Sequence, residues 1–187
     1  MRFFLQTGLL VLVFAIETLG QDAPTPEVSN ATLPDCNELF EKAEHSFSRR
    51  NLGSEMLGKT EQQLKEVVRL CNETPGGFPA EEQLKILHEE QAEHGLQIAN
   101  FFLNKSHNGH GGTLGAQGRL KDIIERYPNY SHLDQVLFLL GKLRLSDGNL
   151  DEAATYFRRL LEEYPGSQNA AQAALELNTI EVFKISP

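Results

Sequence analysis

Two histidines in a glycine-rich segment are the residues of this sequence best suited to bind a metal ion. His107 and His110 lie within residues 104–112 (NKSHNGHGG), and His94 or His132 could complete a site. Neutral imidazole is a common metal ligand. The segment has no cysteine or carboxylate beside the histidines, which is more typical of a solvated loop. We therefore expect no metal and no cofactor, and a small metal- or ligand-carrying protein is the alternative.

The patterns that could support catalysis are incomplete. His88-Glu89 begins like the His-Glu-x-x-His motif of zinc proteases, but Ala92 stands where the second histidine belongs. Glu89, Glu90 and Glu93 are more typical of a solvated helix face than of a general acid–base pair. The glycines of residues 109–118 have neither of the spacings found in nucleotide-binding loops. We expect no catalytic residue and no enzymatic activity.

The two cysteines, Cys36 and Cys71, are spaced as the ends of a helical hairpin. Cys36 opens one predicted helix and Cys71 closes the next, and the turn at residues 51–54 lies midway between them. Antiparallel arms of equal length bring the two ends together, and an oxidising compartment favours a bond there. We predict a Cys36–Cys71 disulfide, with two free buried thiols as the alternative.

The N-terminus has the organisation of a secretory signal peptide. Arg2 precedes a nearly continuous apolar stretch over residues 3–16, which is too short for a transmembrane helix. Small residues precede a cleavage site that we place after Gly20, although a buried N-terminal helix would also be apolar. Residues 21–34 hold three prolines and predict a disordered linker. The protein is thus expected to be exported, to be soluble after cleavage, and to fold over residues 35–187.

The charge balance excludes two classes of partner. The chain carries a net charge of −9 and has a pI near 5.2, without a basic stripe. Such a chain repels nucleic acid and anionic membrane surfaces. No later segment is long and apolar enough to span a membrane. We therefore expect the partners to be proteins or peptides.

Beyond residue 36 the apolar residues recur at helical spacing, with prolines and glycines between the periodic runs. The pattern predicts an all-α fold of about seven helices. Their expected ranges are 36–49, 55–71, 80–104, 113–127, 132–146, 150–164 and 167–183.

An internal repeat organises these helices. Residues 116–128 (AQGRLKDIIERYP) align with residues 153–165 (AATYFRRLLEEYP) at an offset of 37. Around the second copy, Leu140-Gly141, Ala153-x3-Phe157 and Pro165 match the tetratricopeptide-repeat (TPR) pattern. This predicts a TPR-like stack of helical hairpins, a right-handed α-solenoid. Its parts are a degenerate repeat at 36–78, repeats at about 80–128 and 132–165, and a terminal helix at 167–183.

Three segments extend the TPR pattern toward a particular family: residues 92–105 (AEHGLQIANFFLNK), 123–141 (IIERYPNYSHLDQVLFLLG) and 157–165 (FRRLLEEYP). Through them, residues 87–177 resemble the BamD-like family of periplasmic TPR proteins, which help to assemble outer-membrane β-barrels. The chain departs from that family in lacking a lipoprotein cysteine after the signal peptide and in having fewer repeats. The resemblance implies a non-catalytic periplasmic scaffold whose partners are other envelope proteins or peptides. The alternatives are a Tol-Pal-type accessory protein of cell division and a binding subunit of an exported complex.

Alignment to the TPR pattern also suggests a partner-binding groove. The first helix of each hairpin lines the concave side in TPR proteins, and Leu96, Phe138 and Leu175 occupy equivalent positions. We expect these three to form an exposed apolar ladder, unless they pack on neighbouring hairpins. The polar residues predicted beside the ladder are Glu93, Asn100, Gln135 and Lys142.

Overall fold

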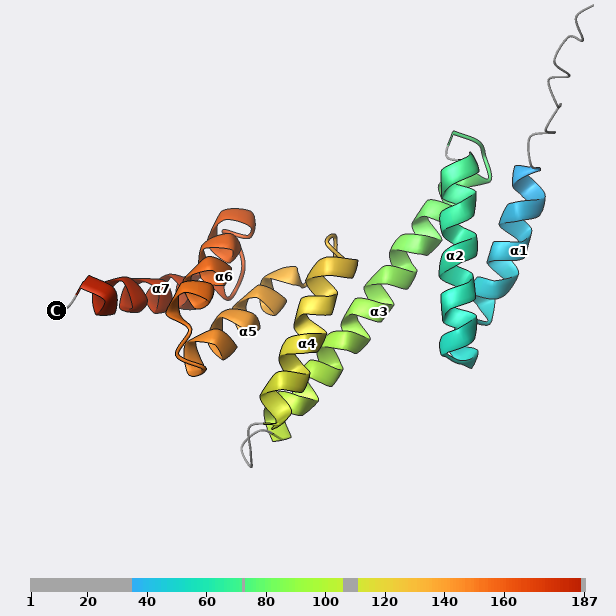
Figure 1. The fold of residues 1–187 in the computed structure, drawn as a ribbon. Coiled ribbons are helices and arrows are strands. Elements are labelled where there is room, and N and C mark those ends of the chain that lie inside the picture. The colour runs from blue at the N-terminus through green and yellow to red at the C-terminus, as the bar shows by residue number, and fades with distance from the viewer. Residues whose placement is uncertain (1–34, 72, 106–110, 186–187) are drawn as a thin grey trace, which may run out of the picture. The chain divides into compact units, whose positions relative to one another are not determined.

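The chain folds into helices throughout the part that the structure describes. The computed structural model describes residues 35–71, 73–105 and 111–185. Its helices are α1 (Cys36–Ser48), α2 (Ser54–Cys71), α3 (Gly77–Lys105), α4 (Gly111–Arg126), α5 (Leu133–Ser146), α6 (Leu150–Glu163) and α7 (Ala170–Ile185), with a short 3₁₀ turn η1 (Arg50–Leu52) (Figure 1). The all-α prediction is confirmed. The predicted signal peptide, the linker, His107 and His110 lie outside the described residues.

Every predicted helix is present, and its ends differ from the predicted ones by three residues at most. α3 begins earlier than expected, at Gly77, because Pro79 is compatible with the first turn of a helix. α7 begins later, at Ala170. There the Ser167 hydroxyl accepts the Asn169 N–H at 3.0 Å, which keeps the preceding residues in a turn.

Each helix packs against the next one in sequence, so the fold is a series of hairpins. α3 is the longest helix and contacts α2 with one part of its length and α4 with another (Figure 1). Three hydrophobic clusters fill the spaces between helices. Their buried members include Ala43, Leu64, Val67 and Leu87 between α1, α2 and α3; Leu96, Leu120, Ile123 and Leu140 between α3, α4 and α5; and Leu137, Phe157, Leu160 and Ile180 between α5, α6 and α7.

The buried side of α3 changes along its length. Ala80 and Leu87 belong to the cluster with α1 and α2, whereas Ala92, Leu96 and Ala99 belong to the cluster with α4 and α5. The step of five residues from Leu87 to Ala92 moves the buried stripe to another side of the helix, because helical neighbours on one side are three or four residues apart. One helix thereby joins two hairpins.

The α5–α6 hairpin follows the TPR spacing closely. Gly141 and Ala153 are buried, and a Cβ atom built on Gly141 would lie 2.5 Å from Cε1 of Phe157. Only glycine therefore allows the Phe157 ring to sit against α5. Gly148 turns the chain with φ 77°, and the side chain of Asn149 accepts the Glu152 N–H at 3.2 Å to cap α6.

A disulfide closes the first hairpin. Cys36 is the first residue of α1 and Cys71 the last of α2, and their Cα atoms are 5.8 Å apart with the two sulfurs bonded. The structure and the sequence-based pairing agree. The two cysteines are 35 residues apart in sequence, so the bond constrains the whole of α1 and α2.

Candidate protein-interaction surface

The three residues predicted to form an apolar ladder are not exposed together. Leu96 is only 3% exposed and lies in the cluster between α3, α4 and α5. Phe138 is half-buried against the cluster of α5, α6 and α7, with its ring centroid 6.1 Å from that of Phe157. Leu175 is 62% exposed on α7. The expectation of one exposed ladder is therefore wrong, because neighbouring helices cover the first two positions to different extents.

The polar residues predicted beside the ladder divide into two kinds. Glu93 accepts hydrogen bonds from the Tyr130 hydroxyl at 2.5 Å and from the Gln97 amide at 3.0 Å. The ammonium group of Lys142 lies 2.7 Å from the Glu176 carboxylate and links α5 to α7. Asn100 and Gln135 are half-buried. Glu93 and Lys142 thus join elements of the fold, and a role of any of the four in binding a partner stays a prediction.

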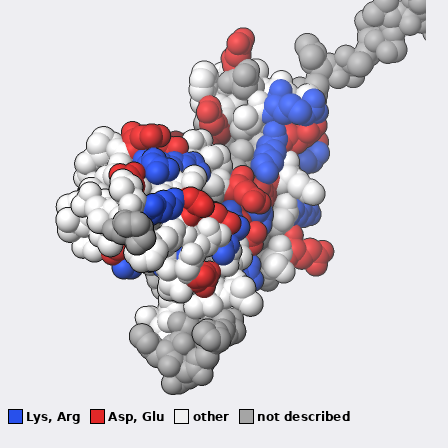
Figure 2. Space-filling view, turned by 60° about the vertical axis from the view of Figure 1, so that its left-hand side comes forward, with Lys and Arg blue, Asp and Glu red and all other residues white. Residues whose placement is uncertain are grey.

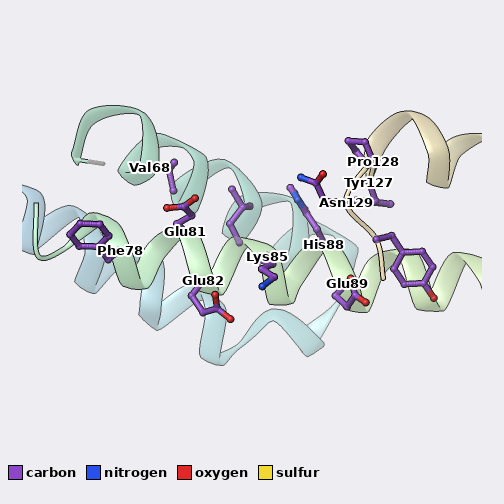
Figure 3. A pocket seen from close by; sticks show the side chains of 12 residues that line it. Val68, Phe78, Glu81, Glu82, Lys85, His88, Glu89, Tyr127, Pro128 and Asn129 are labelled. Atoms are coloured by element: carbon purple, nitrogen blue, oxygen red, sulfur yellow. The ribbon is translucent and has the colours of Figure 1, made fainter. Parts of the chain in front are cut away.

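A groove lies elsewhere, along the first half of α3. It has a volume of about 650 Å³ and is bordered by α2 and by the turn between α4 and α5 (Figure 3). We call it the α3 groove. Its lining residues are Val68, Phe78, Glu81, Glu82, Leu84, Lys85, His88, Glu89, Tyr127, Pro128, Asn129 and Tyr130.

The turn that closes one end of the α3 groove is held by hydrogen bonds to α3. The Glu89 carboxylate accepts the backbone N–H of Ser131 at 3.2 Å and also the Ser131 hydroxyl. The Tyr127 hydroxyl donates to the Gln91 amide oxygen at 2.7 Å. On helical periodicity alone, the polar side chains of Glu89 and Gln91 would be expected to face solvent instead of bonding to this turn.

His88 joins the groove to α2. Its ring lies 5.5 Å from the Tyr127 ring between centroids, and its Nε2 is 3.3 Å from Oε1 of Glu61. Burial raises the pKa of Glu61, but the hydrogen bond and charge of Lys65, together with His88, outweigh burial and leave the pKa below its ordinary value. Glu61 thus pairs as an anion with the Lys65 ammonium group of α2 at 2.7 Å and also contacts the His88 ring of α3.

Glu89 and Glu93 are half-buried and Glu90 is exposed, so these carboxylates are partly solvated as expected, but each also has a partner in the fold. Glu89 binds Ser131, Glu93 binds Tyr130, and Glu90 pairs with the Arg50 guanidinium at 2.6 Å. Their partners lie about 40 residues away in sequence, so helical periodicity carried no signal for them. The Tyr-Pro-Asn-Tyr-Ser turn after α4 was the one available hint, because its polar groups need partners where the chain turns.

The Glu93–Tyr130 hydrogen bond predicts a pH dependence of stability at both ends of the scale. The hydrogen bonds from Tyr130 and Gln97 lower the Glu93 pKa below 4.5, so the unfolded state binds more protons there and acid destabilises the fold. Burial and Glu93 raise the Tyr130 pKa above 10.0, so the native state holds its proton longer and alkali destabilises the fold. Tyr130→Phe should cost about 1 to 2 kcal/mol at neutral pH.

The test is urea unfolding of both proteins across the pH range. The stability difference between wild type and Tyr130→Phe should shrink below pH 4.5 and above pH 10.0. Tyr164→Phe is the control, since burial also raises the Tyr164 pKa but the residue has no carboxylate acceptor among the described residues. A Tyr130→Phe difference that stays constant in acid would contradict the proposed bond.

The half-buried position of Phe138 gives a second prediction. Phe138→Ser should lower the free energy of unfolding by about 2 kcal/mol, roughly half the cost expected for a fully buried phenylalanine. Leu175→Ser is the matched control on α7 and should change stability by less than about 0.5 kcal/mol. Thermal melts of both variants measure this. If Phe138→Ser is as stable as wild type, Phe138 does not stabilise the fold and is again a candidate for binding a partner.

The surface, the metal-binding side chains and the helix lengths add three observations. On the face drawn in Figure 2, Lys and Arg side chains lie beside Asp and Glu side chains rather than in a separate basic patch. Within residues 35–71, 73–105 and 111–185, no group of three or more His, Cys, Asp or Glu side chains is arranged to hold a metal ion. In the same ranges, no helix has the length and apolar character that crossing a membrane requires.

Comparison with known proteins identifies one part of the chain. No curated protein matches the sequence significantly. Residues 135–167 match a family model described as a tetratricopeptide repeat. The match spans most of α5, all of α6 and the turn after it, where the Gly141–Phe157 contact lies. The chain therefore contains a tetratricopeptide repeat at residues 135–167, a module that serves protein–protein interaction.

Proposed function

We propose that this protein is a non-catalytic scaffold that binds other proteins in an oxidising, extracytoplasmic compartment. The TPR hairpin of α5 and α6 is the observation that carries the proposal, because such repeats usually bind proteins and catalyse nothing. The Cys36–Cys71 disulfide supports the compartment, since structural disulfides persist where thiols are not kept reduced.

Within this function, we propose a periplasmic role in assembling outer-membrane proteins. The support is the resemblance of residues 87–177 to BamD-like proteins, together with the leader-like apolar stretch at residues 3–16. A Tol-Pal-type accessory protein or a binding subunit of an exported complex would have the same hairpins. The identity of the partner distinguishes these roles.

The test is crosslinking in intact cells of the source organism, followed by purification of the tagged chain and identification of its partners. Barrel-assembly components would support the proposed role, and Tol-Pal proteins or an exported enzyme would replace it with the corresponding alternative. Sequencing the N-terminus of the purified chain tests export. If the leader is cleaved after Gly20, the first residue is Gln21. A chain recovered with an intact leader and only cytosolic partners would overturn the proposal.

A further inference from the structure

We propose that the α3 groove binds a peptide segment in which a lysine or arginine lies next to a bulky apolar side chain. This inference rests on the proposed function and specifies the partner's chemistry. It places the contact on the first half of α3 rather than on the ladder expected from the TPR pattern. The groove has an apolar lining, unpaired charges and walls held by hydrogen bonds.

Apolar side chains form one part of the groove. Phe78 is 65% exposed and lies at one end, while Val68 and Leu84 line the wall toward the first core cluster (Figure 3). Pro128 lines the opposite end, in the turn after α4. A single exposed phenylalanine needs no explanation, but one that opens onto an apolar-walled groove offers a docking site for a bulky side chain.

Unpaired carboxylates give the groove its charge preference. Among the described residues, the side chains of Glu81 and Glu82 form no hydrogen bond or ion pair, whereas the Glu89 carboxylate is bonded to Ser131. Lys85 is likewise without an ionic partner in the described part of the chain. Two carboxylates and one ammonium group in the lining leave an excess of negative charge. A segment with net positive charge is complementary to it.

The walls of the groove are held before any partner arrives. Glu89 fixes the α4–α5 turn through Ser131, Tyr127 donates to Gln91, and His88 lies between Glu61 and the Tyr127 ring. A preformed site avoids the ordering cost that a mobile surface would pay on binding. From Phe78 to Glu89 the helix rises about 16 Å, which matches about five residues of extended chain.

Selection from a phage-displayed library of random peptides, each about 12 residues long, on the folded, oxidised chain tests this chemistry. We expect the enriched peptides to place Lys or Arg within two positions of Phe, Leu, Ile or Trp. Binding of a synthetic enriched peptide, followed by fluorescence anisotropy, should weaken about tenfold or more in the Glu81→Lys/Glu82→Lys variant and should weaken as salt is added.

Two further variants separate the groove from general charge. Glu55→Lys/Glu162→Lys makes the same change in net charge at exposed glutamates on α2 and α6, and should bind the peptide as wild type does. Phe78→Ser should weaken binding without changing the helical circular dichroism. A peptide whose basic residues are changed to glutamate should bind Glu81→Lys/Glu82→Lys more tightly than wild type.

Enrichment of acidic peptides, no enrichment at all, or equal weakening by the two charge variants would each overturn the inference. These results leave the proposed function to be decided by the cellular crosslinking. If partners are crosslinked but Glu81→Lys/Glu82→Lys captures them as wild type does, the scaffold function stands and the groove inference fails. If no extracytoplasmic partner is crosslinked, the scaffold function fails by itself.

Discussion

Replacing Phe157 with alanine is expected to lower the free energy of unfolding by about 3 to 5 kcal/mol. The Phe157 side chain is fully buried in the cluster that joins α5, α6 and α7. Its ring lies against Gly141, so truncation would leave a cavity in the middle of the TPR hairpin rather than at its edge. Urea unfolding followed by helical circular dichroism measures the loss, and a loss below about 1 kcal/mol would contradict the packing.

A substitution on the facing helix tests the same contact from the other side. Gly141→Ala should cost about 1 to 3 kcal/mol, because the new methyl group would meet the Phe157 ring. Combined with Phe157→Ala, the methyl group enters the space that the ring has left. The loss in the double variant should therefore be smaller than the sum of the two single losses. Strictly additive losses would show that the two positions do not touch.

Loss of the Cys36–Cys71 disulfide is expected to destabilise the first hairpin by about 3 to 4 kcal/mol. The bond closes a sequence separation of 35 residues, and chain entropy in the unfolded state accounts for most of this value. The hairpin depends on it because only part of one face of α1 is buried, at Ala43 and Ser46. In Cys36→Ser/Cys71→Ser, amide exchange should accelerate in α1 and α2 more than in α5 and α6.

The reducing agent dithiothreitol supplies the control for that prediction. It should lower the melting temperature of the wild type toward that of Cys36→Ser/Cys71→Ser, and it should not affect the double variant, because the chain has only these two cysteines. A wild-type protein with the same melting temperature with and without the reductant would show that the bond contributes no stability. Uniform acceleration of exchange over all helices would show instead that the hairpins unfold as one cooperative unit.

The Gly141–Phe157 contact and the Cys36–Cys71 disulfide lie in different hairpins. The α5–α6 hairpin is stabilised by close packing between a glycine and an aromatic ring, and the α1–α2 hairpin by a covalent bond. α3 connects the two regions, and the α3 groove lies along its first half. A partner bound there would contact residues of α2 and of the α4–α5 turn at once.

The sequence by itself determined the helices, the TPR hairpin and the cysteine pair. These features depend on short-range rules: apolar residues at helical spacing, prolines and glycines at the turns, and small residues where two helices approach. The pairing of Cys36 with Cys71 followed from a turn that lies midway between them in the sequence. The residue types and spacing of Gly141, Ala153 and Phe157 predicted that the two helices of the hairpin approach closely. The structure shows this approach between Gly141 and Phe157.

Only the tertiary structure decided which surfaces remain free. Helical periodicity shows that α3 has an apolar side, but not that its buried side changes between Leu87 and Ala92 as the helix passes from one cluster to the next. That change buries Leu96, which the repeat alignment had placed in an exposed groove. The partners of Glu89 and Glu93 lie about 40 residues away, and such contacts depend on how hairpins stack. The α3 groove exists because α2 and the α4–α5 turn meet beside the same helix, which no local pattern in the sequence encodes.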